Sequence, residues 1–461
     1  MGQAHLFDPG SIDTFRVVGW DLDEPTWTVR LRYALDDRHH FEEVVTFESV
    51  PRGATVDRAG LSRALDQLLV AAGVSYYKAA APPTVVVESG PLTDGAAEVH
   101  RSLYDEGLRE FAVSNGLPVP RDVTWVRSTA PDPGPPGGAD PRPGGDVRRL
   151  AVPIGGGKDS MVLIEALRPL GPRLFAVNPH PLVRSLAEEA GLELLTVRRR
   201  LDPALLDLNE RGALNGHVPI TAVVSLLAVA GAFLHGYDTV AMAVERSASE
   251  ETVLVDGVPV NHQFSKSVGF ERSLRDLVTG SVDPSILYGS ALRPYSELAI
   301  ARAFAGLGRY RSTFCSCNTV FRRAAGPDDR WCGDCPKCRF VGLMLAPFIG
   351  PGELTAIIGR DMFADPAQRD GFAALMSDGD KPFECVGERR ESAAALVLLA
   401  GSPQWADHPV VADLAAPARS LVTEGDVAAL LTPERSLDFP DPTVAHAVAS
   451  LLDPPTSRDA R

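Results

Sequence analysis

The sequence lacks two features that would direct the chain into or across a membrane. It has no cationic start followed by an apolar run, and therefore no predicted signal peptide. The longest uncharged segment, Val218 to Leu234, contains Pro219, Thr221, Ser225 and Gly231. We therefore expect this segment to form a buried helix rather than a membrane span, in a cytoplasmic protein without a membrane partner.

Positive charge and cysteine are also scarce. The 461 residues include 45 Lys and Arg against 60 Asp and Glu, and the formal net charge of -15 disfavours a nucleic-acid partner. Five of the six cysteines lie between Cys315 and Cys338, and without a secretion signal this clustering predicts metal binding rather than disulfides. The length and the 45% hydrophobic content suffice for two or three domains.

The start of the chain has the pattern of a small α+β domain. Two alternating runs, residues 26–33 and 41–47, predict a half-buried antiparallel hairpin. Apolar residues at helical spacing follow, with Asp57 as a candidate N-cap. We expect these elements to belong to an N-terminal α+β domain of residues 1–128.

The rest of the chain divides by composition and periodicity. Residues 129–147 are dominated by Pro and Gly and predict a linker. In residues 148–340 strands alternate with helices, which predicts an α/β fold with a doubly wound parallel sheet and a ligand at the carboxyl ends of its strands. Residues 341–461 are predicted to form a mainly helical C-terminal region.

The strongest local motif is a strand, a glycine loop and a helix in direct succession. The apolar run from Leu150 to Ile154 predicts a buried strand, and an amphipathic helix begins near Ser160. Glycines in such a loop let backbone N–H groups approach a phosphate, and the helix dipole favours the negative charge. The candidate nucleotide-binding residues are Gly155, Gly156, Gly157, Lys158, Asp159, Ser160 and, at the end of the next strand, Asn178.

Two common nucleotide loops do not fit this motif. A Walker A loop requires Ser or Thr after Gly-Lys, but Asp159 follows Lys158. A dinucleotide fingerprint requires a glycine where Ser160 stands and an acidic residue at the end of the second strand, where Asn178 stands. Asp159 is instead suited to ligate Mg²⁺, and Lys158 is predicted either to neutralise phosphate or to point to solvent.

Further polar residues follow predicted strands or interrupt apolar segments. Arg246 comes just after a strand and is suited to grip a carboxylate or phosphate. His262 and Lys266 lie in the polar run Asn-His-Gln-Phe-Ser-Lys-Ser and are candidate proton carriers. His217, at the start of the uncharged segment, is a candidate structural contact at a helix N-terminus. Cys385 is either a buried, inert thiol or a reactive thiolate among charged neighbours.

Four cysteines have the spacing of a metal site. Cys317, Cys332, Cys335 and Cys338 offer four soft ligands, which suits a tetrahedral, structural Zn²⁺. The alternative to Zn²⁺ at these four cysteines is an iron–sulfur cluster. Cys315 is either spare or exchanges roles with Cys317.

The glycine loop resembles the PP-loop of the ATP pyrophosphatase superfamily, usually Ser-Gly-Gly-x-Asp-Ser, with Gly155 in place of the first Ser. With the Asn-His-Gln-Phe-Ser-Lys run, the cysteine cluster and the Lys-Pro-Phe-Glu-Cys segment, the chain resembles the ATP-dependent UDP-N-acetylmuramoyl-L-alanyl-L-glutamate epimerases. The resemblance implies the PP-loop, or adenine nucleotide alpha hydrolase, type of sheet, with ATP and Mg²⁺ as cofactors. It also implies a small-molecule substrate, a UDP-muramoyl dipeptide, and a role in peptidoglycan synthesis, cell shape and division.

The family's reaction gives roles to the candidate residues. ATP activates the α-carboxyl of the terminal L-Glu as an acyl-adenylate, with release of pyrophosphate; the Cα proton is removed and returned on the opposite face, and hydrolysis then frees AMP. The resemblance implies that the PP-loop residues hold pyrophosphate and Mg²⁺ and that Arg246 binds the glutamyl or nucleotide anion. His262 or Lys266 would move the proton, and Cys385 is the candidate second base.

Two other functions remain open from the sequence. The first is another PP-loop adenylating enzyme that forms an amide or nitrile or transfers sulfur, as in the similar 7-cyano-7-deazaguanine synthases. The second is an adenine-nucleotide-binding sensor without turnover. The sequence leaves the oligomeric state undefined.

Overall fold

The computed structural model describes residues 6–90, 92–127, 148–322, 330–377 and 381–453. The predicted linker, residues 129–147, lies outside this part of the chain. The strands are β1 Thr14–Asp23, β2 Thr28–Leu35, β3 His39–Phe47, β4 Thr84–Val87, β5 Thr124–Arg127, β6 Leu150–Pro153, β7 Arg173–Val177, β8 Leu194–Arg200, β9 Thr239–Met242, β10 Val253–Val255, β11 Val258–Val260 and β12 Leu287–Ser290.

Helices surround these strands, and many of the segments with helical spacing are helical in the structure. The α-helices are α1 Arg58–Ala72, α2 Val74–Tyr77, α3 Asp94–Asp105, α4 Arg109–Ser114, α5 Lys158–Leu167, α6 Pro181–Ala190, α7 Pro203–Glu210, α8 Ile220–His235, α9 Val268–Leu277, α10 Glu297–Ala305, α11 Asn318–Arg322, α12 Pro336–Leu345, α13 Pro351–Ile358, α14 Arg369–Ala374, α15 Arg389–Ala400, α16 Pro409–Leu421, α17 Glu424–Leu430 and α18 Pro442–Leu452. Asp57 caps α1 as predicted, because its side chain accepts hydrogen bonds from the amides of Ala59 and Gly60.

Ten of the strands form one mostly parallel sheet, with the order β12-β9-β6-β7-β8-β3-β2-β1-β4-β5. This confirms the predicted α/β class. The parallel half runs from β12 to β8, and its order reverses at β6, because β7 and β8 lie on one side and β9 and β12 on the other. A ligand crevice is expected beyond the carboxyl ends of the strands at such a switch point. The glycine loop follows β6 and therefore lies at this position.

Helices cover both faces of the parallel half. Val152 of β6 packs with one hydrophobic cluster, which includes residues of α5 and α6, whereas the adjacent Ala151 packs with another, which includes residues of α8. Because both faces are buried, these strands are apolar runs rather than alternating ones. The expected buried helix is confirmed as α8, which packs against α1. In the described ranges, every helix is too short or too polar to span a membrane.

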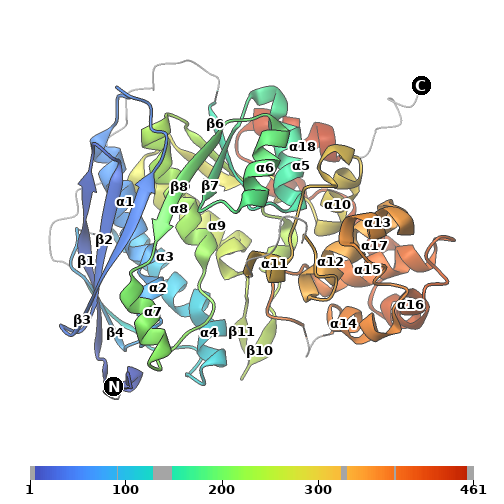
Figure 1. The fold of residues 1–461 in the computed structure, drawn as a ribbon, viewed down its shortest axis with the longest axis horizontal. Helices are drawn as coiled ribbons and strands as arrows, with labels where there is room; N and C mark the ends of the chain where they lie inside the picture. Colours follow the sequence, from blue (N-terminus) through green and yellow to red (C-terminus); the bar gives the residue numbers. More distant parts are fainter. Residues whose placement is uncertain (1–5, 91, 128–147, 323–329, 378–380, 454–461) are drawn as a thin grey trace.

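The N-terminal strands extend the same sheet. The predicted hairpin is confirmed as β2 and β3, and the sequence prediction missed β1, which pairs antiparallel with β2. Residues 44–47 of β3 pair with residues 197–200 of β8, so the sheet is continuous between the two halves. Figure 1 shows the N-terminal strands (blue) at one edge and the C-terminal helices (orange) at the opposite edge. The division into residues 1–128 and 148–340 stays a prediction.

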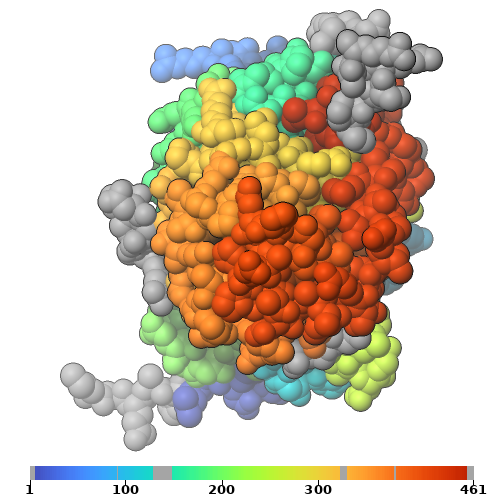
Figure 2. Space-filling model, turned by 90° about the vertical axis from the view of Figure 1, so that its right-hand side faces the viewer, coloured from blue at the N-terminus to red at the C-terminus, as the bar shows by residue number. Residues whose placement is uncertain are grey.

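The C-terminal region, in its described part, is built of helices. α15 and α16 pack against each other, and α18 returns to contact α5 of the parallel half. Figure 2 shows that the orange and red part of the chain covers one face of the molecule.

A buried ion pair lies at the junction between the two halves of the sheet. Glu43 of β3 is fully buried, and its carboxylate accepts hydrogen bonds from Arg199 Nε at 2.6 Å and Arg199 Nη2 at 3.0 Å. Arg199 Nη2 also bonds to the Ser75 hydroxyl at 3.0 Å. The pair therefore holds the register between β3 and β8.

We expect Glu43→Ala to lower the free energy of unfolding by about 3–5 kcal/mol, because Arg199 would remain buried without its counter-ion. The neighbouring Glu42 pairs with Arg30 on the surface, so Glu42→Ala is the matched control and is expected to cost at most about 1 kcal/mol. Urea unfolding of the full chain measures both. Equal effects of the two substitutions would contradict the structural role of the buried pair.

Candidate functional site

The glycine loop joins β6 to α5 and has the geometry of an anion site. Gly157 is the N-cap of α5, and among the described residues no side chain caps this helix, so its first amides are available to a ligand. A Cβ added to Gly155 would have no described atom within 4 Å, so this side of the loop is open. Gly156 has φ +93°, in the region that favours glycine. The Ser160 hydroxyl donates to the Gly157 carbonyl at 3.0 Å and fixes the turn.

Three carboxylates gather beside this loop. Asp159 at the start of α5, Glu245 after β9 and Glu297 at the start of α10 have carboxylate oxygens within 4.8 Å of one another. Lys158 Nζ contacts Asp159 Oδ1 at 2.5 Å and also contacts Glu297 Oε2. Because Lys158 is only 1% exposed, the prediction that it points to solvent is wrong.

The carboxylates carry more negative charge than Lys158 neutralises. Burial and repulsion from Asp159 raise the pKa of Glu297 to about 7, against the opposing effect of Lys158. The fully buried Glu391 holds Glu297 in place by accepting a hydrogen bond from its backbone N–H at 2.8 Å. A cluster of oxygen ligands with surplus negative charge fits Mg²⁺.

His262, Lys266 and Cys385 meet in a second cluster, although they come from distant parts of the chain. Lys266 Nζ lies 3.3 Å from Cys385 Sγ. His262 hydrogen-bonds with Cys385 and, through Nδ1, with Glu110 Oε2 at 2.5 Å. The structure therefore brings together the three residues that the sequence singles out as candidate proton carriers.

The contacts in this cluster change its acidity. Burial alone would raise the pKa of the Cys385 thiol, but the Lys266 ammonium and the hydrogen bond to His262 lower it to about 6. Burial likewise disfavours a charged His262, but hydrogen bonds to Cys385 and Glu110 raise its pKa to about 9. At neutral pH the cluster therefore holds a thiolate and an imidazolium.

Residues around His262 extend this cluster beyond the sequence prediction. Glu110 of α4 was missed, and its partner is 152 positions away, so no local pattern joins them. The rings of His217 and His262 are 4.3 Å apart, and burial lowers the pKa of His217 to about 4. His217 is therefore a neutral neighbour of the charged His262. The sequence analysis also missed Glu297. Its position at a helix start after a strand is the one sequence signal that could have indicated a site residue.

Lys266 links the second cluster to the carboxylates. Its ammonium interacts with Glu245 and Asp159 as well as with Cys385, and these three anions raise its pKa against the effect of burial. The buried Arg293 fixes the geometry, because its guanidinium donates to the Lys266 carbonyl at 2.8 Å and to the Glu245 carbonyl. The two clusters are thus parts of one site at the carboxyl edge of the sheet.

Two predicted site residues lie apart from these clusters. Arg246 follows Glu245, and its guanidinium is 3.8 Å from the Glu434 carboxylate. The side-chain amide of Asn178 binds the backbone of Arg199, donating to its carbonyl at 2.6 Å and accepting from its N–H at 2.9 Å. These contacts give Asn178 a structural position between β7 and β8, and its predicted role in cofactor binding stays a prediction.

The four predicted metal ligands come together. The sulfur atoms of Cys317 and Cys335 are 4.0 Å apart, those of Cys332 and Cys338 are 3.7 Å apart, and those of Cys335 and Cys338 are 3.5 Å apart. Cys315 lies outside this set, because its thiol donates to the Arg330 carbonyl at 2.7 Å. Of the two alternatives for the fourth ligand, the structure therefore selects Cys317.

The cysteine segment also supports the glycine loop. The Cys315 N–H donates to the Gly156 carbonyl at 3.0 Å. A Cβ on Gly157 would be 2.9 Å from the Ser316 hydroxyl, so the two segments are in close contact. The cysteine segment and the anion site are therefore in direct contact.

Comparisons with known proteins identify the family of the chain. Residues 6–291 match the MurL N-terminal domain, and residues 313–428 match the MurL C-terminal domain. Three relatives are each named UDP-N-acetyl-alpha-D-muramoyl-L-alanyl-L-glutamate epimerase. The Salinispora tropica protein is 43% identical over 96% of this chain and 97% of its own length. The Micromonospora protein is 44% identical over 87% of this chain and 90% of its own length. The Xanthomonas oryzae pv. oryzae protein is 42% identical over 88% of this chain and 90% of its own length.

No solved structure matches the chain. The PP-loop type of the sheet therefore stays a prediction from the loop and the strand order. The domain matches and the identity along nearly the whole length are nevertheless sufficient to identify the family: the chain belongs to the MurL family.

Proposed function

We propose that this protein is an isomerase that converts the terminal L-Glu of UDP-N-acetylmuramoyl-L-alanyl-L-glutamate to D-Glu, with cleavage of ATP to AMP and pyrophosphate, in peptidoglycan synthesis. The names of its relatives support the substrate and the epimerisation. The observation that carries the mechanism is the position of Lys266, whose ammonium contacts the Cys385 thiol and interacts electrostatically with Glu245 and Asp159, because it joins a proton-transfer group to an anion site.

The reaction requires activation because the Cα proton of a free carboxylate is very weakly acidic. Bound ATP supplies the adenylyl group that converts the carboxylate into a neutral, electron-withdrawing acyl group. The amides of the Gly155–Gly157 loop and of the α5 N-terminus would hold the phosphates, and Asp159, Glu245 and Glu297 would hold Mg²⁺. Mg²⁺ contributes charge neutralisation at these phosphates.

Inversion at Cα requires one group to remove the proton and another to return it on the opposite face. The Cys385 thiolate is the base, and the His262 imidazolium, held by Glu110, is the acid. Because these two side chains hydrogen-bond to each other, the substrate Cα must enter between them for the proton to return on the opposite face. Lys266 keeps the thiol ionised and stabilises the negative charge that develops on the acyl oxygen. Arg246 binds a substrate or nucleotide anion. Its guanidinium is 3.8 Å from the half-exposed Glu434 carboxylate, which such an anion would replace.

A single Zn²⁺ fits the four thiols as a structural ion. Tetrahedral coordination at about 2.3 Å places neighbouring sulfur atoms about 3.8 Å apart, and the observed separations are 3.5–4.0 Å. An iron–sulfur cluster needs more space between its ligands than these separations leave. The ion would brace the segment that contacts the glycine loop.

We expect full-length protein with ATP, Mg²⁺ and the UDP-muramoyl dipeptide in D₂O to produce AMP and pyrophosphate, invert the glutamate and place deuterium at Cα. Nucleotide chromatography, chiral analysis and mass spectrometry measure the three outcomes together. Turnover that releases ADP, or that proceeds without nucleotide, would contradict the proposal. A product with an added nitrogen or sulfur atom would instead identify another adenylating enzyme.

We expect Cys385→Ser to lower the rate of epimerisation by about 10²–10⁴-fold, the usual contribution of a positioned base. The release of AMP should persist, because the carboxylate cluster and the glycine loop are unchanged and water can still hydrolyse the adenylate. His262→Ala should also lower the rate of epimerisation. If Cys385→Ser keeps full Cα deuteration, then Cys385 is not the base.

We expect the pH profile of kcat/KM to be bell-shaped. The rate should fall as pH drops below about 6, where the Cys385 thiolate becomes protonated, and as pH rises above about 9, where His262 loses its proton. Lys266→Met removes the cation that lowers the thiol pKa and should move the acid limb to higher pH. An acid limb that stays in place would show that Lys266 does not tune this group.

We expect about one zinc per chain in the purified protein. Cys335→Ala should lower both the zinc content and the melting temperature, because it removes one of the four ligands. Cys315→Ser is the matched control and should retain zinc, since the Cys315 thiol bonds to the Arg330 carbonyl instead. Elemental analysis and thermal unfolding measure these outcomes, and a stably folded, metal-free wild-type protein would exclude the zinc site.

A further inference from the structure

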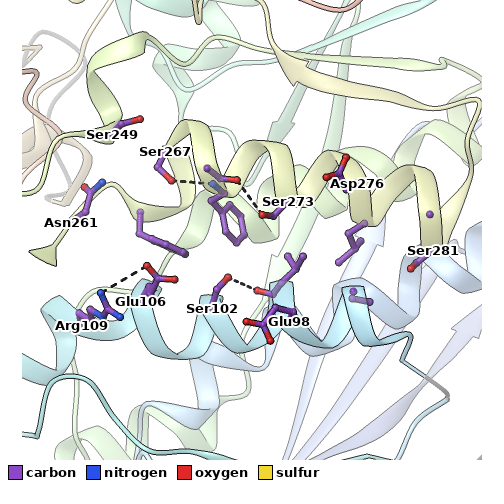
Figure 3. Close-up of a pocket in the computed structure, with 18 of the residues that line it drawn as sticks. Glu98, Ser102, Glu106, Arg109, Ser249, Asn261, Ser267, Ser273, Asp276 and Ser281 are labelled. Carbon is purple, nitrogen blue, oxygen red and sulfur yellow. Dashed lines mark hydrogen bonds and ion pairs between the residues drawn. The ribbon is translucent and has the colours of Figure 1, made fainter. Parts of the chain in front are cut away.

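A cleft of about 890 Å³ lies between α3 and α9. It is next to the reaction centre, by which we mean the cluster of Glu110, His262, Lys266 and Cys385 with the neighbouring carboxylates. Figure 3 shows its two walls: Glu98, Ser102 and Glu106 lie along α3 and the turn after it, and Ser273 and Asp276 lie on α9. This volume lies within the range that binds small molecules, about 300–1,000 Å³. The proposed reaction uses none of the residues that line the cleft.

Three segments of the chain contribute both to the lining of the cleft and to the site that contains His262, Lys266 and Cys385. The first contributes Glu110 to the reaction centre and the adjacent Arg109 to the cleft. The second contributes His262 to the centre and the adjacent Asn261 to the cleft. The third extends from Glu245, in the carboxylate cluster, to a lining residue four positions later, Ser249. The same three segments therefore build both the site and the lining of the cleft.

The charges in the cleft disfavour an anionic group. Glu98, Glu106, Glu251 and Asp276 are lining carboxylates, and Arg109 is the single basic residue among the described residues that line the cleft. Arg109 is already paired with Asp105 at 3.0 Å and lies 3.9 Å from Glu106. A diphosphate would therefore meet like charge without a free counter-ion.

The same lining suits a neutral ring with several hydroxyl groups. Carboxylates such as those of Glu251 and Asp276 accept hydrogen bonds from ligand hydroxyls, and the serine hydroxyls add further polar contacts. Phe264 and Phe270 lie in the wall with ring centroids 5.2 Å apart and present an apolar surface to the C–H face of such a ring.

On the basis of the function proposed above, we propose that the cleft between α3 and α9 binds a neutral hydroxylated ring of the nucleotide-sugar substrate, and that the diphosphate lies outside the cleft. Both the muramoyl pyranose and the uridine ribose have this chemistry. The ring is held by α3 from the N-terminal half and by α9 from the parallel half. Both halves thus contribute to recognition of the substrate.

The test fills the cleft from each wall with a bulky side chain. Ser273→Trp on α9 and Ser102→Trp on α3 should each raise KM for the UDP-muramoyl dipeptide at least about tenfold, equivalent to about 1.4 kcal/mol. The value of kcat should stay within about threefold, because neither residue touches the reaction centre. Arg272→Trp is the matched control, since Arg272 is exposed on α9 and is not part of the lining. Its KM should equal that of the wild type.

Thermal unfolding first checks that both Trp variants are folded. Where one is not, Asp276→Asn takes its place; it removes a carboxylate from the lining and should likewise raise KM. Calorimetry with uridine and with N-acetylmuramoyl-L-alanyl-L-glutamate then identifies the ring, because the filled cleft should weaken binding of one of these probes. An unchanged KM and unchanged probe binding in folded variants would overturn the cleft proposal alone. A wild-type protein that releases no AMP from ATP and the UDP-muramoyl dipeptide would instead contradict the proposed function.

Discussion

The two parts of the site depend on the charge of the partly buried Lys266 ammonium. It lies 3.3 Å from the Cys385 sulfur and interacts with Glu245 and Asp159. Without this cation, a thiolate and a carboxylate cluster would repel each other in a poorly screened interior. Arg293 holds the backbone carbonyls of Lys266 and Glu245, so the position of the charge is fixed by the fold rather than by a flexible side chain alone. Activation and proton transfer can therefore share one small volume.

Features that are contiguous in the chain could be predicted from the sequence. The glycine loop, the cysteine spacing and the polar run around His262 each indicate their chemistry through neighbouring residues, and the structure places each of them near the crevice. Partners from distant segments could not be predicted in this way. Glu110 reaches His262 across 152 positions, and Glu297 joins Asp159 only because α10 begins beside α5. The lowered pKa of Cys385 follows from its contacts with Lys266 and His262, whereas the sequence left a reactive thiolate there as one of two alternatives.

The fold was predictable to a similar extent. Buried parallel strands are apolar runs separated by helices, and this pattern predicted the α/β class; the edge at which a ligand binds stays a prediction. The pairing between β3 and β8 was not predicted, because strand partners depend on tertiary contacts and the chain between the two halves suggested separate units. Lys158 shows the same limit: its sequence neighbours do not reveal that Glu297 draws it into the interior.

The junction of β3 and β8 also bears on how the chain can evolve. A parallel half made alone would leave β8 as an edge strand whose unpaired backbone groups could recruit a second copy, a well-known route to aggregation. The N-terminal strands cover that edge, and α4 of the same half contributes Glu110 to the cluster of His262, Lys266 and Cys385. Fission into two separately expressed polypeptides would therefore lose solubility and catalysis together, which favours retention of both halves in one gene product.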